Sequence, residues 1–245
     1  MLKNLAILSL LFLSSCNVLQ PPPDLTWDHD PEAVIIKTTD GGGLEPLAAA
    51  RNRIPDGVVF GDGRIIWTTF EDGRRQVRQG QLSEDEMMTL LETFADKGFW
   101  RLDDFYRPRE EVFDSSTTRL TVNLISENKS VGEYHNGAPR VFDELVGLVS
   151  SGAGAEGDTY MPQMGYLSIM PIDGVYNPSD ILAWESDAVD FRLADAEDGW
   201  VEGPVLAQAW TIVNRKYWSP IVVEDDIYYE LYLEIPELTG RDPTQ

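Results

Sequence analysis

The two histidines and the single cysteine are the side chains in this chain best suited to nucleophilic or metal chemistry. By residue type alone, Cys16 has four candidate roles: a nucleophile, a metal ligand, half of an intermolecular disulfide or an anchor. No histidine lies near it in the sequence, and nothing around it would lower the pKa of its thiol. These observations argue against a catalytic cysteine, and the preceding residues decide among the other roles.

Residues 1–15 have the pattern of a secretory signal. Lys3 supplies a positive charge, and Leu5 to Leu13 is almost wholly apolar. This run is too short to cross a bilayer, which takes roughly 20 apolar residues. Leu13-Ser14-Ser15-Cys16 then resembles the lipobox of bacterial lipoproteins, in which the cysteine thiol is acylated and the chain is cut just before it. An ordinary secretory signal with an incidental cysteine is the alternative.

The lipobox resemblance implies an address. A lipid on Cys16 would tether the protein to a bacterial membrane on the extracytoplasmic face: the cell surface, the periplasm or the outer membrane. Residues 16–32 are polar and contain Pro21-Pro22-Pro23, a composition typical of a semi-rigid stalk. The membrane is therefore an expected partner through Cys16.

His135 is the better of the two histidines as a candidate for catalysis. It ends a predicted strand two residues after Glu133, and alternate strand residues point to the same face. This spacing would suit a carboxylate/His135 centre in an extracytoplasmic hydrolase. A histidine that caps a strand before an Asn-Gly turn is the more ordinary interpretation. Zinc catalysis usually needs three protein ligands, so we expect no metal and no cofactor.

Two further motifs have ordinary interpretations. Gly152 to Gly157 matches the dinucleotide-binding pattern GxGxxG, but it follows a predicted helix instead of a strand, so we interpret it as a linker. The acidic runs Asp28 to Glu32 and Asp195 to Gly199 resemble parts of calcium loops without the full twelve-residue pattern. A solvated acidic surface is the favoured interpretation. A calcium-stabilised structural domain remains an alternative.

Two groups of side chains are candidate partner surfaces. The first shares one face of a predicted strand whose other face is apolar. It is suited to a protein or sugar partner, and the alternative is that a helix or a second sheet covers it. The second is a basic group on one predicted hairpin; it would either pair with the acidic half of the chain or dock an anionic partner, and the internal pairing is slightly favoured. The first group is Tyr228, Glu230, Tyr232 and Glu234; the second is Arg64, Arg74, Arg75 and Arg78.

Charge and composition limit the function classes. The chain of 245 residues has a formal net charge of −23, which opposes nucleic-acid binding and repels anionic headgroups. Residues 161–245 carry 16 acidic against 4 basic residues. Hydrophobic residues make up 42% of the chain and include seven tryptophans, enough for a folded core.

The pattern of elements predicts an α+β fold of antiparallel sheets with helices packed on one face, in two small subdomains. Glycine turns separate the first strands, and Ser83 with Glu86 forms a capping box. In the first unit we expect strands at 34–39, 58–60, 65–70, 74–81, 119–124 and 130–135, and helices at 83–97 and from 139. In the second we expect strands at 166–172, 189–193, 221–224 and 227–235, and a helix at 204–216. The predicted division is 1–15 signal peptide, 16–32 lipidated stalk, 33–150 first domain, 151–160 linker, 161–238 second unit and 239–245 tail.

The first unit resembles a known family in three stretches: VVFGDGRIIW (58–67), LSEDEMMTLLETFADKGFWRLDD (82–104) and STTRLTVNLISENKSVGEYHNGAP (116–139). They are similar to an uncharacterised bacterial domain of unknown function that is common in lipoproteins. The resemblance covers about half of the chain and implies no catalytic residues. Together with the lipobox, it favours a non-catalytic binding or interaction module of the cell envelope, with an envelope protein or glycan as partner.

Overall fold

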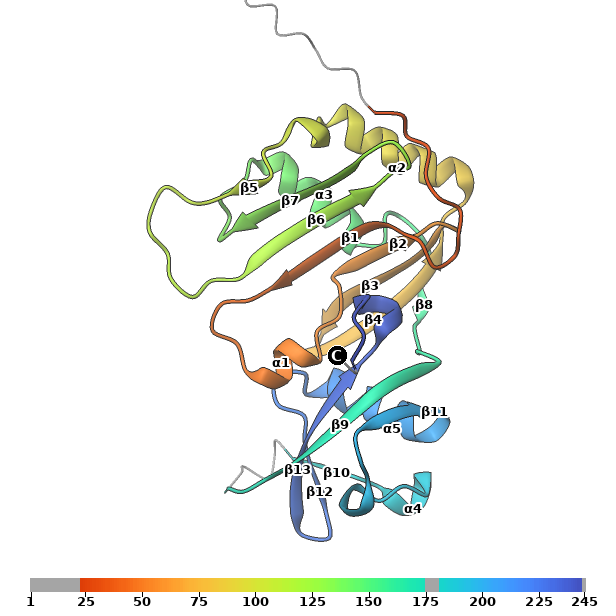
Figure 1. The fold of residues 1–245 in the computed structure, drawn as a ribbon, viewed down its shortest axis with the longest axis vertical. Helices are drawn as coiled ribbons and strands as arrows, with labels where there is room; N and C mark the ends of the chain where they lie inside the picture. Colours follow the sequence, from red (N-terminus) through yellow and green to blue (C-terminus); the bar gives the residue numbers. More distant parts are fainter. Residues whose placement is uncertain (1–22, 175–180, 244–245) are drawn as a thin grey trace, which may run out of the picture.

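The computed structural model describes residues 23–174 and 181–243, and it has the predicted α+β fold. Two mostly antiparallel sheets lie one above the other in Figure 1, with helices along the first sheet and around the second. Cys16 and its lipobox lie outside the described residues. Within the described part of the chain, no helix is long and apolar enough to span a membrane.

The first sheet has eight strands in the order β5-β7-β6-β1-β2-β3-β4-β8. All neighbouring pairs are antiparallel except β5 and β7. Tight turns at Gly61–Gly63 and Asp72–Gly73 join β2 to β3 and β3 to β4, as the glycine pattern predicts. The strands are β1 (Val34–Gly41), β2 (Gly57–Phe60), β3 (Arg64–Glu71), β4 (Arg74–Gln81), β5 (Phe105–Tyr106), β6 (Thr117–Asn123), β7 (Asn128–Tyr134) and β8 (Asp158–Thr159).

Two helices cover one face of this sheet, α2 (Glu84–Asp96) and α3 (Arg140–Ser150). The capping box of α2 is present: the Ser83 hydroxyl accepts a hydrogen bond from the Glu86 amide, and the Glu86 carboxylate accepts one from the Ser83 amide. Gly98 follows the helix with a φ of 78°, the left-handed conformation that favours glycine. Both helices bury an apolar stripe on β1, β2, β3 and β6.

The second sheet has five strands in the order β10-β12-β13-β9-β11. Helix α5 (Gly203–Arg215) packs on it and buries the predicted stripe of Leu206, Ala209, Trp210 and Val213. The prediction of a strand at 189–193 is wrong. Helix α4 (Ser186–Val189) ends at the first residue of this segment, and a 3₁₀ turn (Leu193–Asp195) begins at its last residue. The strands are β9 (Met164–Ile172), β10 (Leu182–Ala183), β11 (Gly199–Glu202), β12 (Ile221–Glu224) and β13 (Ile227–Glu234).

The two units share one hydrophobic core. Val58 and Phe60 of β2 point away from α2 and α3 and pack with the second sheet and α5, whereas Val59 between them packs with the two helices. Around β2, each face of the first sheet is therefore covered, one by helices and the other by the second unit. Burial of both faces explains why all four residues of β2 are buried.

The predicted linker is packed against the core. Gly152 has a φ of 84°, and a Cβ there would lie 2.8 Å from the indole of Trp67; a Cβ at Gly157 would also overlap this ring. The chain then adds β8 to the edge of β4. The glycine spacing that resembles a nucleotide-binding loop thus serves to let the backbone pass over a buried tryptophan.

The segment before Ala33 is also part of the folded body. Trp27 is only 4% exposed, and its indole N–H donates to the Gly61 carbonyl at 3.0 Å. Leu25 also packs against the core, so packing in the described residues begins inside the predicted stalk of residues 16–32. The predicted boundary at residue 33 is therefore too late, because the folded body includes residues that the sequence assigned to the stalk.

Candidate functional site

The face of the second sheet that points away from the shared core carries most of its exposed aromatic and acidic side chains. We call it the outer face. Strand register places Tyr166 of β9 between Trp200 on β11 and Glu234 on β13, and Met170 beside Glu230. The side chains between these on β13 (Tyr229, Leu231 and Leu233) point into the core. The outer face consists of Met164, Tyr166, Met170, Trp200, Glu202, Tyr228, Glu230, Tyr232 and Glu234.

The outer face has a covered part and an open part. Tyr232 is 2% exposed, so it does not belong to an accessible surface as the sequence suggested. The Arg51 guanidinium, at the end of α1 (Leu47–Arg51), lies 4.9 Å from the centre of its ring. The Tyr232 hydroxyl donates to Glu230 at 2.7 Å, and both burial and this carboxylate raise the hydroxyl pKa. Helix α1 therefore closes one end of the face.

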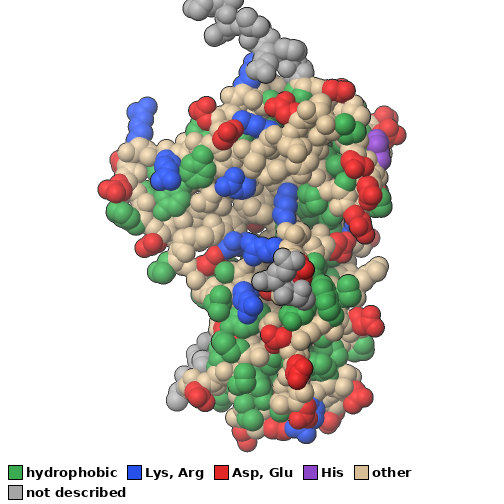
Figure 2. All heavy atoms as spheres, viewed as in Figure 1, with side chains coloured by type: hydrophobic (Ala, Val, Ile, Leu, Met, Phe, Trp, Pro, Cys, Tyr) green, Lys and Arg blue, Asp and Glu red, His purple; other side chains and the backbone are tan. Residues whose placement is uncertain are grey.

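Beyond α1 the outer face is open to solvent. Met164, Trp200 and Met170 are 52%, 47% and 40% exposed. The rings of Tyr166 and Trp200 meet edge to face, with centroids 5.6 Å apart and an interplanar angle of 85°. Figure 2 shows hydrophobic side chains interspersed with acidic ones over the half of the molecule that contains β9 and β13. The pairing of β11 with β9 places Trp200 on this face. The sequence did not predict β11 as a strand.

The arginine hairpin makes mainly internal contacts. Arg64 forms an ion pair with Glu237 in the acidic second unit, and Arg78 lies 3.0 Å from Glu71. Arg75 is buried: it donates to Asn214 Oδ1 at 2.6 Å and to the Asn52 carbonyl at 2.7 Å. Burial lowers the pKa of Arg75 to about 10. Arg74 is exposed. Arg64, Arg75 and Arg78 therefore make contacts within the protein, as the favoured interpretation of the sequence predicted.

A cleft of about 470 Å³ opens where the two units meet. Asp56, just before β2, lies in it beside Asp40 at the end of β1. Burial is the main cause that raises the pKa of Asp56 from 3.8 to about 7, and the Asp40 carboxylate adds to it. Two carboxylates in one partly desolvated site favour a protonated Asp56. Neither residue stands out in the sequence, because their proximity arises from strand register.

The walls of this cleft are aromatic and basic. The Phe70 ring of β3 lies 5.4 Å from that of Tyr217, which lies 5.3 Å from Trp218. Arg53 crosses the backbone of Gly41, where a Cβ would overlap its guanidinium, and it pairs with Glu45. The cleft therefore combines a proton-carrying carboxyl with rings that offer flat apolar surfaces. Such a junction between units is a common place for a small-molecule site.

His135 and Glu133 are oriented toward different partners. His135 lies past the end of β7 with a φ of 50°, and its Nδ1 is 2.9 Å from the Ser115 hydroxyl. Glu133 is buried and accepts a hydrogen bond from the Ala138 amide at 3.0 Å. Burial, with the neighbouring Asp143, raises the pKa of Glu133. The geometry fits the ordinary interpretation of His135 as a strand-end residue, and the structure brings no catalytic pair together here.

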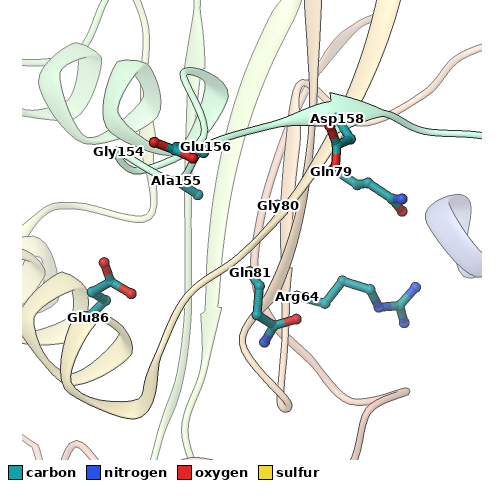
Figure 3. A pocket seen from close by; sticks show the side chains of 9 residues that line it. All are labelled: Arg64, Gln79, Gly80, Gln81, Glu86, Gly154, Ala155, Glu156 and Asp158. Atoms are coloured by element: carbon teal, nitrogen blue, oxygen red, sulfur yellow. The ribbon is translucent and has the colours of Figure 1, made fainter.

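A larger open hollow of about 790 Å³ lies between the start of α2 and the linker (Figure 3). In Figure 3 Glu86 and Glu156 lie on its helix and linker sides, while Arg64 extends away toward another element. Glu86 is engaged in the capping box and Arg64 in its ion pair with Glu237. Two of the charged groups that line this hollow, Glu86 and Arg64, thus serve the fold.

No group of three or more His, Cys, Asp or Glu side chains suited to a metal ion occurs within residues 23–174 and 181–243. In the acidic run at Asp28, carboxylates of Asp28 and Asp30 accept hydrogen bonds from the amides of Asp30 and Glu32. These local turns account for the spacing of the acids. In comparisons with known proteins, no family model and no curated protein matches this chain.

Proposed function

We propose that the protein is a lipid-anchored, extracytoplasmic binding module of a bacterial cell envelope, and that the outer face is its contact surface. The observation that carries the binding role is the open apolar part of that face, with Trp200, Met164 and Met170 about half exposed. Contiguous exposed apolar side chains with a polar surround are typical of interaction sites. Trp and Tyr are also the residues most enriched among the side chains that dominate binding energy.

The anchoring role rests on the lipobox at Cys16 and on the charge of the body. A body with a net charge of −23 is repelled by anionic headgroups, so attachment needs a covalent lipid. Metabolic labelling with palmitate tests this directly. Cys16→Ser and treatment with the signal-peptidase inhibitor globomycin should each block maturation, and Cys16→Ser should abolish labelling. Unchanged labelling in Cys16→Ser would refute the anchor.

The binding role is tested by crosslinking in intact cells. The wild-type protein, Trp200→Ala and the control Ile125→Ala carry the same photo-crosslinking side chain at Tyr166. Ile125 is 70% exposed in the turn between β6 and β7 of the first sheet, so its loss should leave the outer face intact. A crosslinked product that disappears in Trp200→Ala and persists in Ile125→Ala supports the proposal. Equal products in all three proteins would refute it.

A hydrolase is the second candidate, and the cleft is the observation that favours it. A carboxyl with a pKa of about 7 can act as a general acid near neutral pH while a neighbouring carboxylate acts as base. The pair would be Asp56 and Asp40, in place of the Glu133/His135 centre that the sequence suggested. Glycosidic bonds are the natural substrate class, because the aromatic walls suit sugar rings. Release of reducing ends that is lost in both Asp56→Asn and Asp40→Asn would establish this function.

A further inference from the structure

We propose that the outer face binds a cationic amphipathic polypeptide segment of another envelope protein. This inference rests on the proposed binding function and names the chemistry of the partner. Its basis is the juxtaposition on one sheet face of exposed apolar side chains and carboxylates. Lys or Arg side chains of the partner would meet the carboxylates, and its apolar side chains would cover Trp200 and the methionines.

The charges of the outer face select the sign of the partner. Glu202, Glu230 and Glu234 point to this face, and the Arg51 guanidinium lies 3.9 Å from Glu234 as a partial counter-charge. Three carboxylates against one guanidinium leave the face acidic. A cationic segment gains from this arrangement, whereas like charges opposite each other are destabilising.

The same charges argue against two other occupants. A second copy of the chain would bring the same carboxylates into contact, within two bodies that each carry a net charge of −23. An anionic membrane surface would be repelled in the same way. A stable complex on this face therefore needs a partner of opposite charge or a neutral one.

The shape of the face favours a polypeptide over a neutral glycan. Tyr166 and Trp200 meet at 85°, so their rings do not form one flat platform for stacked sugars. Met164 and Met170, on the same face of β9 two and four residues from Tyr166, add exposed, flexible and polarisable side chains. Such side chains adapt to the irregular surface of polypeptide side chains and are common at peptide-binding surfaces.

The partner class can be tested with three twelve-residue peptides of alternating residues: Lys/Leu, Lys/Ser and Glu/Leu. The full-length lipidated protein is held in nanodiscs of neutral phosphatidylcholine, so that the lipid does not attract the lysines. Fluorescence anisotropy of the labelled peptides gives the dissociation constants at several salt concentrations. Lys/Leu should bind at least about tenfold more tightly than either other peptide, because only it satisfies both parts of the face.

Variants locate the binding. Trp200→Ala should weaken Lys/Leu binding by about tenfold or more, and Glu230→Gln combined with Glu202→Gln should flatten its salt dependence. Ile125→Ala should leave both unchanged. Circular dichroism of each variant confirms folding, and Met164→Ser gives a second probe of the face if Trp200→Ala unfolds.

Three outcomes overturn the proposal. Equal binding of Lys/Leu and Lys/Ser shows attraction by charge alone. Equal binding by wild type, Trp200→Ala and Met164→Ser places the site elsewhere. Displacement of Lys/Leu by an N-acetylglucosamine tetrasaccharide, with tight binding of that sugar, assigns the face to a glycan. The last result keeps the proposed binding function. If Cys16 labelling fails, the anchor is refuted and the same peptide titrations on the protein without nanodiscs test the outer face separately.

Discussion

The contribution of Asp56 to the stability of this protein should fall as pH rises from about 4 to about 7. Its carboxyl has a pKa of about 7 in the folded protein against 3.8 as the reference value. Well below pH 3.8 the group is protonated in both the folded and unfolded states, so it contributes no penalty. As pH rises, the unfolded state releases the proton first, and the folded state is progressively disfavoured.

The size of this effect follows from the two pKa values. The pKa of Asp56 rises from 3.8 to about 7 on folding. Each pKa unit corresponds to about 1.36 kcal/mol, so ionisation of Asp56 should lower the free energy of unfolding by about 4 kcal/mol. This loss is complete slightly above pH 7. Asp56→Asn keeps the shape of the side chain and cannot ionise. It should therefore be more stable than the wild type at pH 8 and lose that advantage by pH 4.

Urea denaturation of wild type and Asp56→Asn between pH 4 and pH 8 measures the difference in unfolding free energy at each pH. Asp104→Asn is the control: its ion pair with Lys129 lowers the Asp104 pKa, so its titration lies below pH 4. The control difference should stay constant between pH 5 and pH 8. A wild-type minus Asp56→Asn difference that is equally flat would refute burial of this carboxyl beside Asp40.

Two packing predictions complement this one. Asn52 joins the units, because its side chain donates to the Leu231 carbonyl at 3.1 Å and accepts from the Leu233 amide at 2.6 Å. Asn52→Ala should lower the free energy of unfolding, measured by urea denaturation, by about 2 to 4 kcal/mol. The control Asn128→Ala, at an exposed position, should lower it by less than about 0.5 kcal/mol. A small loss for Asn52→Ala would mean that the units do not depend on this contact. A Cβ at Gly61 would overlap the carbonyls of Asp28 and Asp30, so Gly61→Ala should lower the free energy of unfolding by about 1 to 3 kcal/mol. Gly147 lies on the open side of α3, where a Cβ meets no other atom, so Gly147→Ala should raise the free energy of unfolding by about 0.5 to 1 kcal/mol. Equal effects of the two glycine changes would contradict the packing of the segment around Trp27.

Local patterns in the sequence were sufficient for most elements of the fold. The capping box at Ser83, the glycine turns of β2 to β4 and the alternation of Leu120 and Val122 each act within a few residues, and each element formed where it was expected. The prediction of a strand at 189–193 was wrong because the apolar residues of this segment are compatible with a strand and with a helical turn alike. Its buried member, Leu193, belongs to the shared core from within a 3₁₀ turn.

The candidate sites were less accessible to sequence reasoning, since they depend on contacts across the chain. The alternation on β13 located the acidic and aromatic residues of the outer face, but the burial of Tyr232 under Arg51 requires helix α1, 181 residues away in sequence. Asp56 and Asp40 come together only because β1 pairs with β2. Neither residue type nor spacing carries a signal of that pairing.

The junction of the two units also explains why the outer face stays acidic. The first unit holds the local excess of arginines, and the structure uses several of them at the junction: Arg64 pairs with Glu237, Arg51 lies near Glu234, and Arg75 is buried between Asn52 and Asn214. Arg64 and Arg75 are engaged at this junction, and Arg51 offsets only part of the charge of the outer face, through Glu234. The acidic residues around Trp200 therefore keep the electrostatic potential of this face negative. A partner that covers the tryptophan has to supply positive charge.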